Sequence, residues 1–474
     1  MIPFQFQKNK GALLILVIVF GAVFFVIAAG SMTYFVTQVR VQEVREQQAQ
    51  AREIAEAGLN YYKWYLAHNP DDVTNGTGLP GPYTLTYDDP ELGAIGEYAL
   101  AIASTTFCGE VSSIEITSTG YTYEDPSRTE TIYARYARPT VAEYAYIINS
   151  SVWAGSDRTI VGPYHSNGGV RMDGTNNSTV SSGQETWNCT SSYGCSPSDS
   201  NADGVVGDGP NFDLWSFPST PINFTGLTVD LATMRDRAEN GGGIYIPPSG
   251  DYGYRVTFQS DGDVEVRVVD RTYNYWGYSS TDGWSTERNV IRDDDPYATY
   301  AINETCPLIF VEDKVWLEGE IPTKVTIAAA DTDTPGVDPT MILNGDITYT
   351  TASSGLLAIA EDNMLVGLAV PNDMELNGIF VAQNGRFGRN HYRTWSSYDV
   401  LSIHNSYVTR NSLTMNGTVV SNGRVGTKWT SGGSFVSGFN TRYNSYDRDL
   451  VNNPPPLAPN TSDDFKFVEW REEY

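Results

Sequence analysis

The sequence has 474 residues, with 30 Lys and Arg against 57 Asp and Glu, so its formal net charge is −27. A surface this acidic repels phosphate backbones and argues against general nucleic-acid binding, while the length suggests two or three domains. The 44 Gly and 30 Tyr residues indicate a turn-rich, mainly β surface protein.

The N-terminal segment is long and apolar. Residues 11–39 carry no charged side chain, and Lys8 and Lys10 precede them. Such a run can cross a bilayer as a helix, whereas the apolar core of a secretory signal peptide is shorter. Helix-forming residues continue beyond it without a proline. We therefore expect one helix over about 12–66 that extends tens of ångströms beyond the membrane.

The order of these features resembles the N-terminus of type IV pilins and of type II secretion pseudopilins. A short basic leader and the pair Lys10-Gly11 precede an apolar helix that becomes amphipathic, and residues 51–59 read AREIAEAGL. That stretch resembles the PilX-like or GspK-like subgroup. The resemblance covers about the first 65 residues. It implies that residues 1–11 are a leader peptide, which a prepilin peptidase removes by cutting between Gly11 and Ala12.

One position departs from the family pattern. Major pilins carry Glu at the fifth position after the cleavage point, where this chain has Leu16. A carboxylate inside a membrane is costly and is therefore usually functional. Its absence resembles pseudopilins at a filament tip, which have no subunit ahead of them. It is equally compatible with a plain membrane anchor that is never cleaved, and both alternatives stay open.

A small sheet is expected after the helix. Several runs alternate polar and apolar residues, are rich in β-branched or aromatic residues, and are separated by turns. We expect residues 67–139 to form a small antiparallel sheet and residues 451–474 to be an extended C-terminal tail. The expected strands are residues 83–87, 96–103, 113–118 and 129–136.

Residues 140–450 show a different pattern, in which short strand-like runs recur with Asn-Gly or Asp-Gly turns. Examples are DMELNGIFVAQNG at 373–385 and LTMNGTVVSNG at 413–423. The recurrence favours a β-helix-like solenoid with Asn and Gly at its corners, where positive φ is tolerated. A β-sandwich with tight hairpins is the alternative, because Asn-Gly is also a hairpin signal. A helix is expected at about 228–239, and the fold class is α+β, mainly β.

Four cysteines suggest disulfides in a region outside the cytoplasm. Cys189 and Cys195 enclose a short polar loop, and we expect them to be bonded. A bridge between Cys108 and Cys306 is left open. No CxxC pair is present, which argues against a structural zinc site.

A calcium site is expected in residues 199–208, which read DSNADGVVGD. Asp199, Asn201 and Asp203 match the first half of a calcium loop, and Asp208 would be a late ligand. The twelfth position of the full motif is Pro210 rather than Glu. The alternative is a solvated turn.

Aromatic residues are the best candidates for contacts with a surface glycan or protein, because flat rings with polar edges suit such surfaces. The expected contact residues are Tyr275, Trp276 and Trp284 in a long loop or irregular hairpin at 271–300, and Trp395, which follows Arg393. The alternative is that these rings pack between strands of the head.

The function expected from these features is that of a minor pilin-like component of a bacterial surface filament. It would be anchored in the cytoplasmic membrane, and residues 140–450 would form a head outside the cytoplasm. This head would serve assembly with other pilin-like subunits or adhesion. One alternative is a singly anchored adhesin that does not polymerise. The other is a β-helix enzyme acting on polysaccharide through the pair Glu318 and Glu320. No catalytic motif supports this last alternative, and we expect no enzyme.

Overall fold

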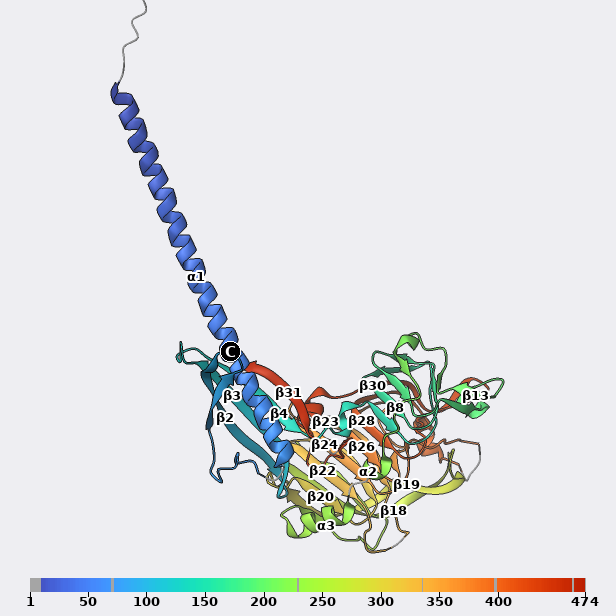
Figure 1. The fold of residues 1–474 in the computed structure, drawn as a ribbon. Helices are drawn as coiled ribbons and strands as arrows, with labels where there is room; N and C mark the ends of the chain where they lie inside the picture. The colour runs from blue at the N-terminus through green and yellow to red at the C-terminus, as the bar shows by residue number, and fades with distance from the viewer. Residues whose placement is uncertain are drawn as a thin grey trace, which may run out of the picture. The chain divides into compact units, whose positions relative to one another are not determined.

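The computed structural model describes residues 10–69, 72–227, 230–334, 336–395, 399–462 and 464–473. The chain forms two compact units, and each is built from separate stretches of sequence. The first comprises residues 1–103, 115–134 and 470–474, and the second comprises residues 104–114 and 135–469. The predicted class is confirmed, because a long apolar helix and a small antiparallel sheet accompany a large β region (Figure 1).

Helix α1 (Lys10–His68) is continuous over 59 residues, as the absence of proline predicts. Its two halves have different surroundings. Every residue from 13 to 43 is exposed, whereas buried positions recur every three or four residues from Ala51 to Leu66. The second half therefore packs one face against the protein, whereas residues 13–43 are not buried by any part of the chain that the structure describes. Residues 1–9 of the expected leader lie outside the described residues.

The small residues of the AREIAEAGL stretch allow the sheet to approach the helix closely. Ala51, Ile54 and Ala55 are fully buried. A Cβ atom on Gly120 would lie 2.2 Å from the carbonyl oxygen of Ala51 and 2.5 Å from the backbone nitrogen of Ala55. No side chain larger than hydrogen fits there, so this pairing of glycine with alanine fixes how the sheet lies on the helix.

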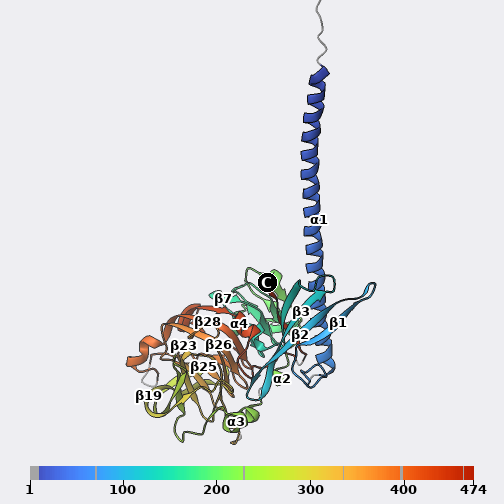
Figure 2. The same ribbon diagram turned by 90° about the vertical axis from the view of Figure 1, so that its left-hand side faces the viewer.

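The sheet of the first unit contains the four predicted strands and one more, and the first three of them are labelled next to one another in Figure 2. The fifth strand is formed by residues that the sequence analysis placed in an extended tail. It pairs with β4, so residues 138–465 are inserted between two neighbouring strands of a single sheet. The order is β1 (Tyr83–Asp89), β2 (Gly93–Phe107), β3 (Glu110–Thr122), β4 (Thr129–Ala137) and β31 (Lys466–Glu473).

The second unit contains a stack of short parallel strands, which is the kind of pairing expected between the rungs of a solenoid. Five strands pair in succession, each in parallel with the next, and Figure 1 shows them side by side. All six residues of β24 are buried, as expected for a parallel strand covered on both faces. The five are β20 (Leu308–Val311), β22 (Lys324–Ala329), β24 (Gly355–Ala360), β26 (Asp373–Ala382) and β28 (Thr409–Ser421).

The order of strands in this stack is not the order of the chain. Strand β28 pairs in parallel with β5, with Val419 opposite Tyr146. Beyond β5 the stack continues through β8, β11 and β15. After β15 the chain returns to the opposite end of the stack, where β16 pairs with β20. The strand β28, which comes late in the chain, is therefore paired with β5, which comes early. These strands are β5 (Tyr146–Ile148), β8 (Tyr164–Ser166), β11 (Val180–Ser182), β15 (Trp215–Ser216) and β16 (Ile244–Ile246).

The crossing contains two helices, α2 (Phe224–Leu227) and α3 (Leu231–Asn240). The helix predicted at about 228–239 corresponds to α3, while Thr228 and Val229 lie outside the described residues. Asp230 caps α3, because its side chain accepts a hydrogen bond from the backbone nitrogen of Thr233.

Two further ladders run beside the first. One contains β17, β21, β23, β25 and β27, and in the other β30 pairs with β7, which pairs with β10. Large aliphatic and aromatic side chains fill the space between the ladders. The strands are β17 (Tyr254–Phe258), β21 (Val315–Ile321), β23 (Met341–Tyr349), β25 (Met364–Val366), β27 (Phe387–Gly388), β30 (Ser434–Ser445), β7 (Arg158–Val161) and β10 (Thr175–Asn176).

The repeated Asn-Gly pairs lie on top of one another. Asn377 is opposite Asn416 and Gly378 is opposite Gly417 in the β26–β28 ladder. The Asn416 amide donates to the Asn377 side-chain oxygen at 3.0 Å. Both glycines have positive φ, +147° and +134°, as a bend in the strand requires. The pairs are therefore stacked bends within strands rather than hairpin turns.

Candidate functional site

The richest group of aromatic side chains lies at the end of a long hairpin. Strands β18 (Asp263–Ser279) and β19 (Gly283–Ala301) pair antiparallel, with bulges, across the stretch expected as a loop or irregular hairpin. Tyr278 and His391 exchange two backbone hydrogen bonds of 2.9 Å. These bonds attach the hairpin end to the segment that contains Arg393 and Trp395.

Four half-buried rings meet at this attachment, and we call them the ring cluster: Tyr278, Trp284, His391 and Trp429. The centroid of Tyr278 lies 5.5 Å from that of Trp284 and 5.5 Å from that of Trp429. His391 lies 5.5 Å from Trp284 and 5.7 Å from Trp429. Tilted and edge-on contacts at these distances are favourable between aromatic rings. The ring cluster therefore holds the hairpin end and the segment of His391 together.

Arg393 and Trp395 lie beside the ring cluster. The guanidinium carbon of Arg393 is 4.1 Å from the Trp284 ring centroid and 5.7 Å from that of Trp395. Asp399, whose side chain is fully buried, accepts hydrogen bonds from Arg393 Nε at 2.8 Å and from the Trp395 backbone nitrogen at 2.9 Å. One buried carboxylate thus positions both the cation and the tryptophan, which is 85% exposed.

The four expected contact residues do not form one surface. Tyr275 is only 2% exposed and packs in a hydrophobic cluster with Val290 and Leu368. Its hydroxyl oxygen lies 2.5 Å from His404 Nδ1. Tyr275 is therefore a core residue, as the packing alternative allows. Trp276 is 38% exposed, and only Trp284 and Trp395 lie together around Arg393.

A buried carboxylate that was not predicted from the sequence belongs to the same hairpin, in strand β19. Glu287 is 8% exposed and accepts hydrogen bonds from the Tyr392 hydroxyl at 2.6 Å and from the side-chain nitrogens of Asn289 and Asn390. Burial raises the pKa of Glu287 above the usual range, and these hydrogen bonds oppose that effect. Nothing in the local sequence distinguishes this residue from an exposed glutamate.

A buried arginine connects three separate backbone segments. Arg389 has no exposed surface, and its guanidinium donates to the carbonyl oxygens of Gly367 at 2.6 Å, Leu368 at 3.1 Å and Tyr407 at 2.6 Å. Burial lowers the pKa of Arg389 to about 10. Because its donors are directed at backbone carbonyls, its role is to hold these segments together.

The structure joins Cys189 to Cys195, the pair expected from the sequence, and it also joins Cys108 to Cys306, the pair left open. Arg424 holds the shorter loop. Its guanidinium lies 4.2 Å from the Tyr193 ring centroid and donates to the carbonyl oxygen of Ser192 at 2.8 Å.

The residues expected to bind calcium lie in a different setting from a calcium loop. Asp199–Asp203 form strand β13, which pairs with β12 (Thr186–Cys189). Asp208 lies outside this hairpin, 3.8 Å from an Arg171 nitrogen. Within the described residues, no group of three or more His, Cys, Asp or Glu side chains is close enough to hold a metal ion. Asp199, Asn201 and Asp203 alternate along one strand and therefore share one of its faces.

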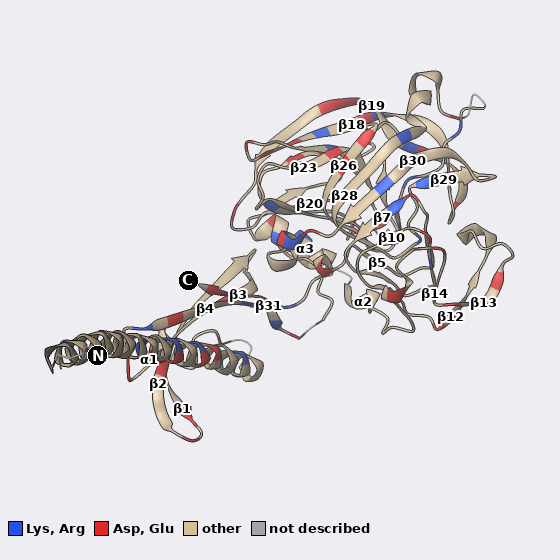
Figure 3. Cartoon of the chain, turned by 90° about the horizontal axis from the view of Figure 1, so that it is seen from above, with Lys and Arg blue, Asp and Glu red and all other residues tan. Residues whose placement is uncertain are grey.

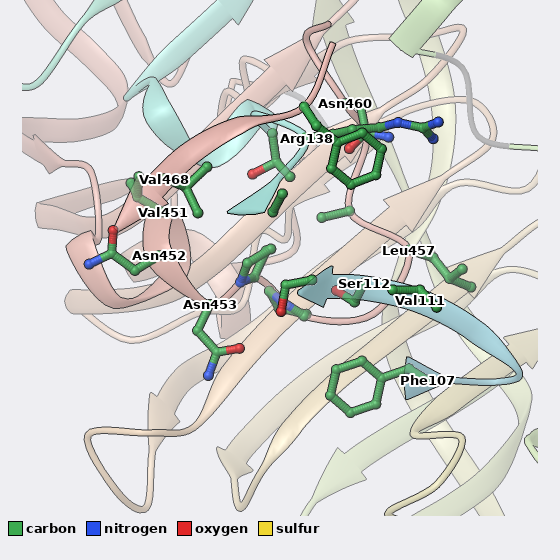
Figure 4. A pocket seen from close by; sticks show the side chains of 17 residues that line it. Phe107, Val111, Ser112, Arg138, Val451, Asn452, Asn453, Leu457, Asn460 and Val468 are labelled. Atoms are coloured by element: carbon green, nitrogen blue, oxygen red, sulfur yellow. The ribbon is translucent and has the colours of Figure 1, made fainter. Parts of the chain in front are cut away.

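A cavity of about 120 Å³ lies in the second unit between the β2–β3 turn and the segment that leads to β31 (Figure 4). Its lining includes Phe107, Leu457 and Phe465. Among the described residues that line it, Arg138 is the one charged side chain, and no pair of an acid with a base or nucleophile is present. The suggested carboxylate pair lies elsewhere, and Glu318 accepts hydrogen bonds from Arg255 Nε at 2.7 Å and from the Asn344 amide at 2.8 Å.

No protein-family model and no curated protein matches the chain. Among solved structures, it is similar to the crystal structure of the competence-associated pilin ComZ from Thermus thermophilus. The two are 12% identical, the alignment covers 90% of this chain and 97% of that chain, and the TM-score is 0.29. A TM-score this low does not by itself establish a shared fold.

Proposed function

We propose that the chain is a membrane-anchored, pilin-like subunit of a bacterial surface filament. The observation that carries this proposal is the division of α1 into two halves. One half is bound by its own sheet through Ala51 and Ala55, and the other is apolar and exposed along its whole length. A single straight helix with these two surfaces is suited to hold a folded domain at one end and to enter lipid or a helical bundle at the other.

The exposed half of α1 needs a covering that the chain itself does not supply. An 18-residue stretch of the helix has a mean hydropathy of 3.0, and none of it is buried. Burying one large apolar side chain contributes about 1.5–3 kcal/mol, so leaving this many in water is strongly unfavourable. A bilayer covers them when the chain is first inserted, and the apolar halves of neighbouring subunits cover them in a filament.

The second unit supports a location outside the cytoplasm. Both of its cysteine pairs are bonded, and disulfides persist in oxidising compartments. Leu16 at the position where major pilins have Glu favours a minor or tip-located subunit over a major one. The alternative that stays open is an adhesin with the same anchor that does not polymerise.

Cross-linking through the exposed half of α1 tests the proposal. We expect Val23→Cys to form disulfide-linked adducts with other subunits in material sheared from the cell surface, since Val23 is 51% exposed in the apolar half of α1. Trp64→Cys is the matched control, because Trp64 is 57% exposed in the half that carries the sheet. Monomer in the membrane fraction alone, with no sheared adduct, would favour the singly anchored alternative.

A further inference from the structure

We propose that the surface around Arg393 binds an anionic carbohydrate. The Arg393 guanidinium pairs with a sugar carboxylate, and the indoles of Trp284 and Trp395 stack on the sugar rings. This inference concerns a ligand of the second unit, and it holds whether or not the chain enters a filament.

The first observation is a local reversal of charge. Residues 386–446 contain seven Lys and Arg but a single acidic residue, Asp399, in a chain whose net charge is −27. Figure 3 shows basic positions on β30 and on β29 (Lys428–Ser431), which follow the segment of Arg393 in the chain. Five of these cations are committed elsewhere. Four are buried, and Lys428 lies 3.5 Å from an Asp157 oxygen; the buried four are Arg386, Arg389, Arg410 and Arg442. Arg393 and Arg424 are half-buried and remain at the surface.

The second observation is that Arg393 is held in place with hydrogen-bonding capacity left over. Its Nε donates to Asp399 at 2.8 Å, and its side chain is 32% exposed. Among the described residues, no hydrogen-bond partner occupies its two terminal nitrogens. A guanidinium can offer two parallel donors to a carboxylate, which is among the strongest and most directional pairings in proteins.

The third observation is the exposed tryptophan beside this cation. Trp395 is 85% exposed, although its backbone nitrogen is fixed by the buried carboxylate of Asp399. Trp284, within the ring cluster, is the second ring next to this cation, with its centroid 4.1 Å from the guanidinium carbon. Rigid aromatic rings offer a large contact area at a low cost in conformational entropy, and sugar rings present apolar C–H faces to them.

The charge density of the ligand favours an acidic glycan over a nucleic acid. Double-stranded DNA carries one charge per about 1.7 Å of length, and the net charge of −27 would repel it. A glycan with one carboxylate on each sugar has a much lower charge density, so a single well-placed guanidinium can outweigh the general repulsion. The acidic surface of a second copy of this chain would also complement the basic segment, and the experiment distinguishes this occupant.

The test uses the full chain in detergent micelles, with galacturonic acid hexamer as the probe and its methyl ester as the neutral matched ligand. We expect the acid to quench tryptophan fluorescence on binding and the ester to bind at least about 10-fold more weakly. Arg393→Gln and Trp395→Ala should each weaken binding of the acid about 10-fold or more. Arg271→Gln is the matched control, because Arg271 is 59% exposed on the same hairpin.

Equal binding of acid and ester, no binding of either at millimolar concentration, or an equal loss in Arg271→Gln would overturn the proposal. So would self-association in sedimentation that Trp395→Ala abolishes, since the surface would then be an interface between copies. Asp399→Asn separates positioning from direct contact. It should weaken binding of the acid and of the ester alike, whereas Arg393→Gln should weaken binding of the acid alone.

Discussion

The first half of α1 exposes large apolar side chains, whereas the interior of the second unit buries charged ones. Both depart from the usual distribution, in which apolar side chains are buried and charged side chains are exposed. Phe24 and Phe25 are 74% and 76% exposed, while Arg389 and Glu287 are almost completely buried. Arg389 donates hydrogen bonds to three backbone carbonyls, and Glu287 accepts one from the Tyr392 hydroxyl. The two phenylalanines lie in the half of α1 in which residues 13–43 are all exposed. The comparison shows that the second unit holds its buried charges by contacts of its own, whereas the exposed half of the helix is suited to apolar surroundings.

The largest effect is expected from removing the buried cation. Arg389→Met keeps most of the volume but leaves the carbonyls of Gly367, Leu368 and Tyr407 without these donors. Each unsatisfied buried group costs about 1–3 kcal/mol, so we expect a loss of more than about 4 kcal/mol and a melting temperature at least about 8 °C lower. Circular dichroism melts of the full chain in detergent measure this change.

Arg271→Met is the control for that variant, because Arg271 is exposed and should tolerate the change within about 0.5 kcal/mol. If both variants have the melting temperature of the unmodified chain, the stability of the second unit does not depend on its buried cation.

The next largest effect is expected from a charge in the exposed half of α1. Phe24→Lys places a charge in the exposed apolar half, which makes membrane insertion about 3 kcal/mol less favourable. We expect less of the chain in washed membranes and an unchanged melting temperature of the second unit. Trp64→Lys, in the other half of the same helix, should leave membrane association intact. Equal loss in both variants would mean that the two halves do not differ in surroundings.

A smaller, pH-dependent effect is expected from Glu287. Burial raises its pKa, so the folded chain keeps a proton that the unfolded chain releases near its usual pKa of about 4.3. The stabilisation is complete below that pH and is lost as pH rises through the raised pKa. We therefore expect the melting temperature of the unmodified chain, relative to Glu287→Gln, to fall as pH rises above about 4.3. Parallel curves across this range would show that Glu287 has an ordinary pKa.

The smallest effect is expected from calcium. The spacing of Asp199, Asn201 and Asp203 predicts a site, but β13 spaces these side chains along a strand. We expect calcium to raise the melting temperature by no more than about 1 °C over a chelator control, since stabilisation scales with occupancy of the folded state. A larger rise that Asp203→Ala abolishes would restore the site expected from the sequence.

The features that could be predicted are those determined by residues that are neighbours in the sequence. The length and apolarity of α1, the alternating strands of the small sheet and the presence of a helix near 228–239 all depend on residues close together in the chain. The Asn-Gly pairs predicted bends with positive φ, and the bends at Gly378 and Gly417 lie opposite each other in a parallel ladder.

The features that could not be predicted depend on pairings across the chain. Nothing local indicates that Val419 lies opposite Tyr146 or that β31 joins the sheet beside β4. The candidate site shows the same limit. Tyr275 and Trp395 both occur in polar, aromatic-rich segments, yet one is 2% exposed and the other 85%. The difference arises from what packs above each residue, which is set by distant strands.

The central claim is that the apolar half of α1 is a processed pilin-like segment, and the mass of the native chain tests it most directly. Intact mass spectrometry should be applied to protein from washed membranes and from sheared surface material. We predict a mature chain that begins at Ala12 in both fractions, and a Gly11→Val variant that keeps its leader and is absent from the sheared fraction. Native protein that retains residues 1–11 in surface material would contradict the claim and identify α1 as an uncleaved anchor.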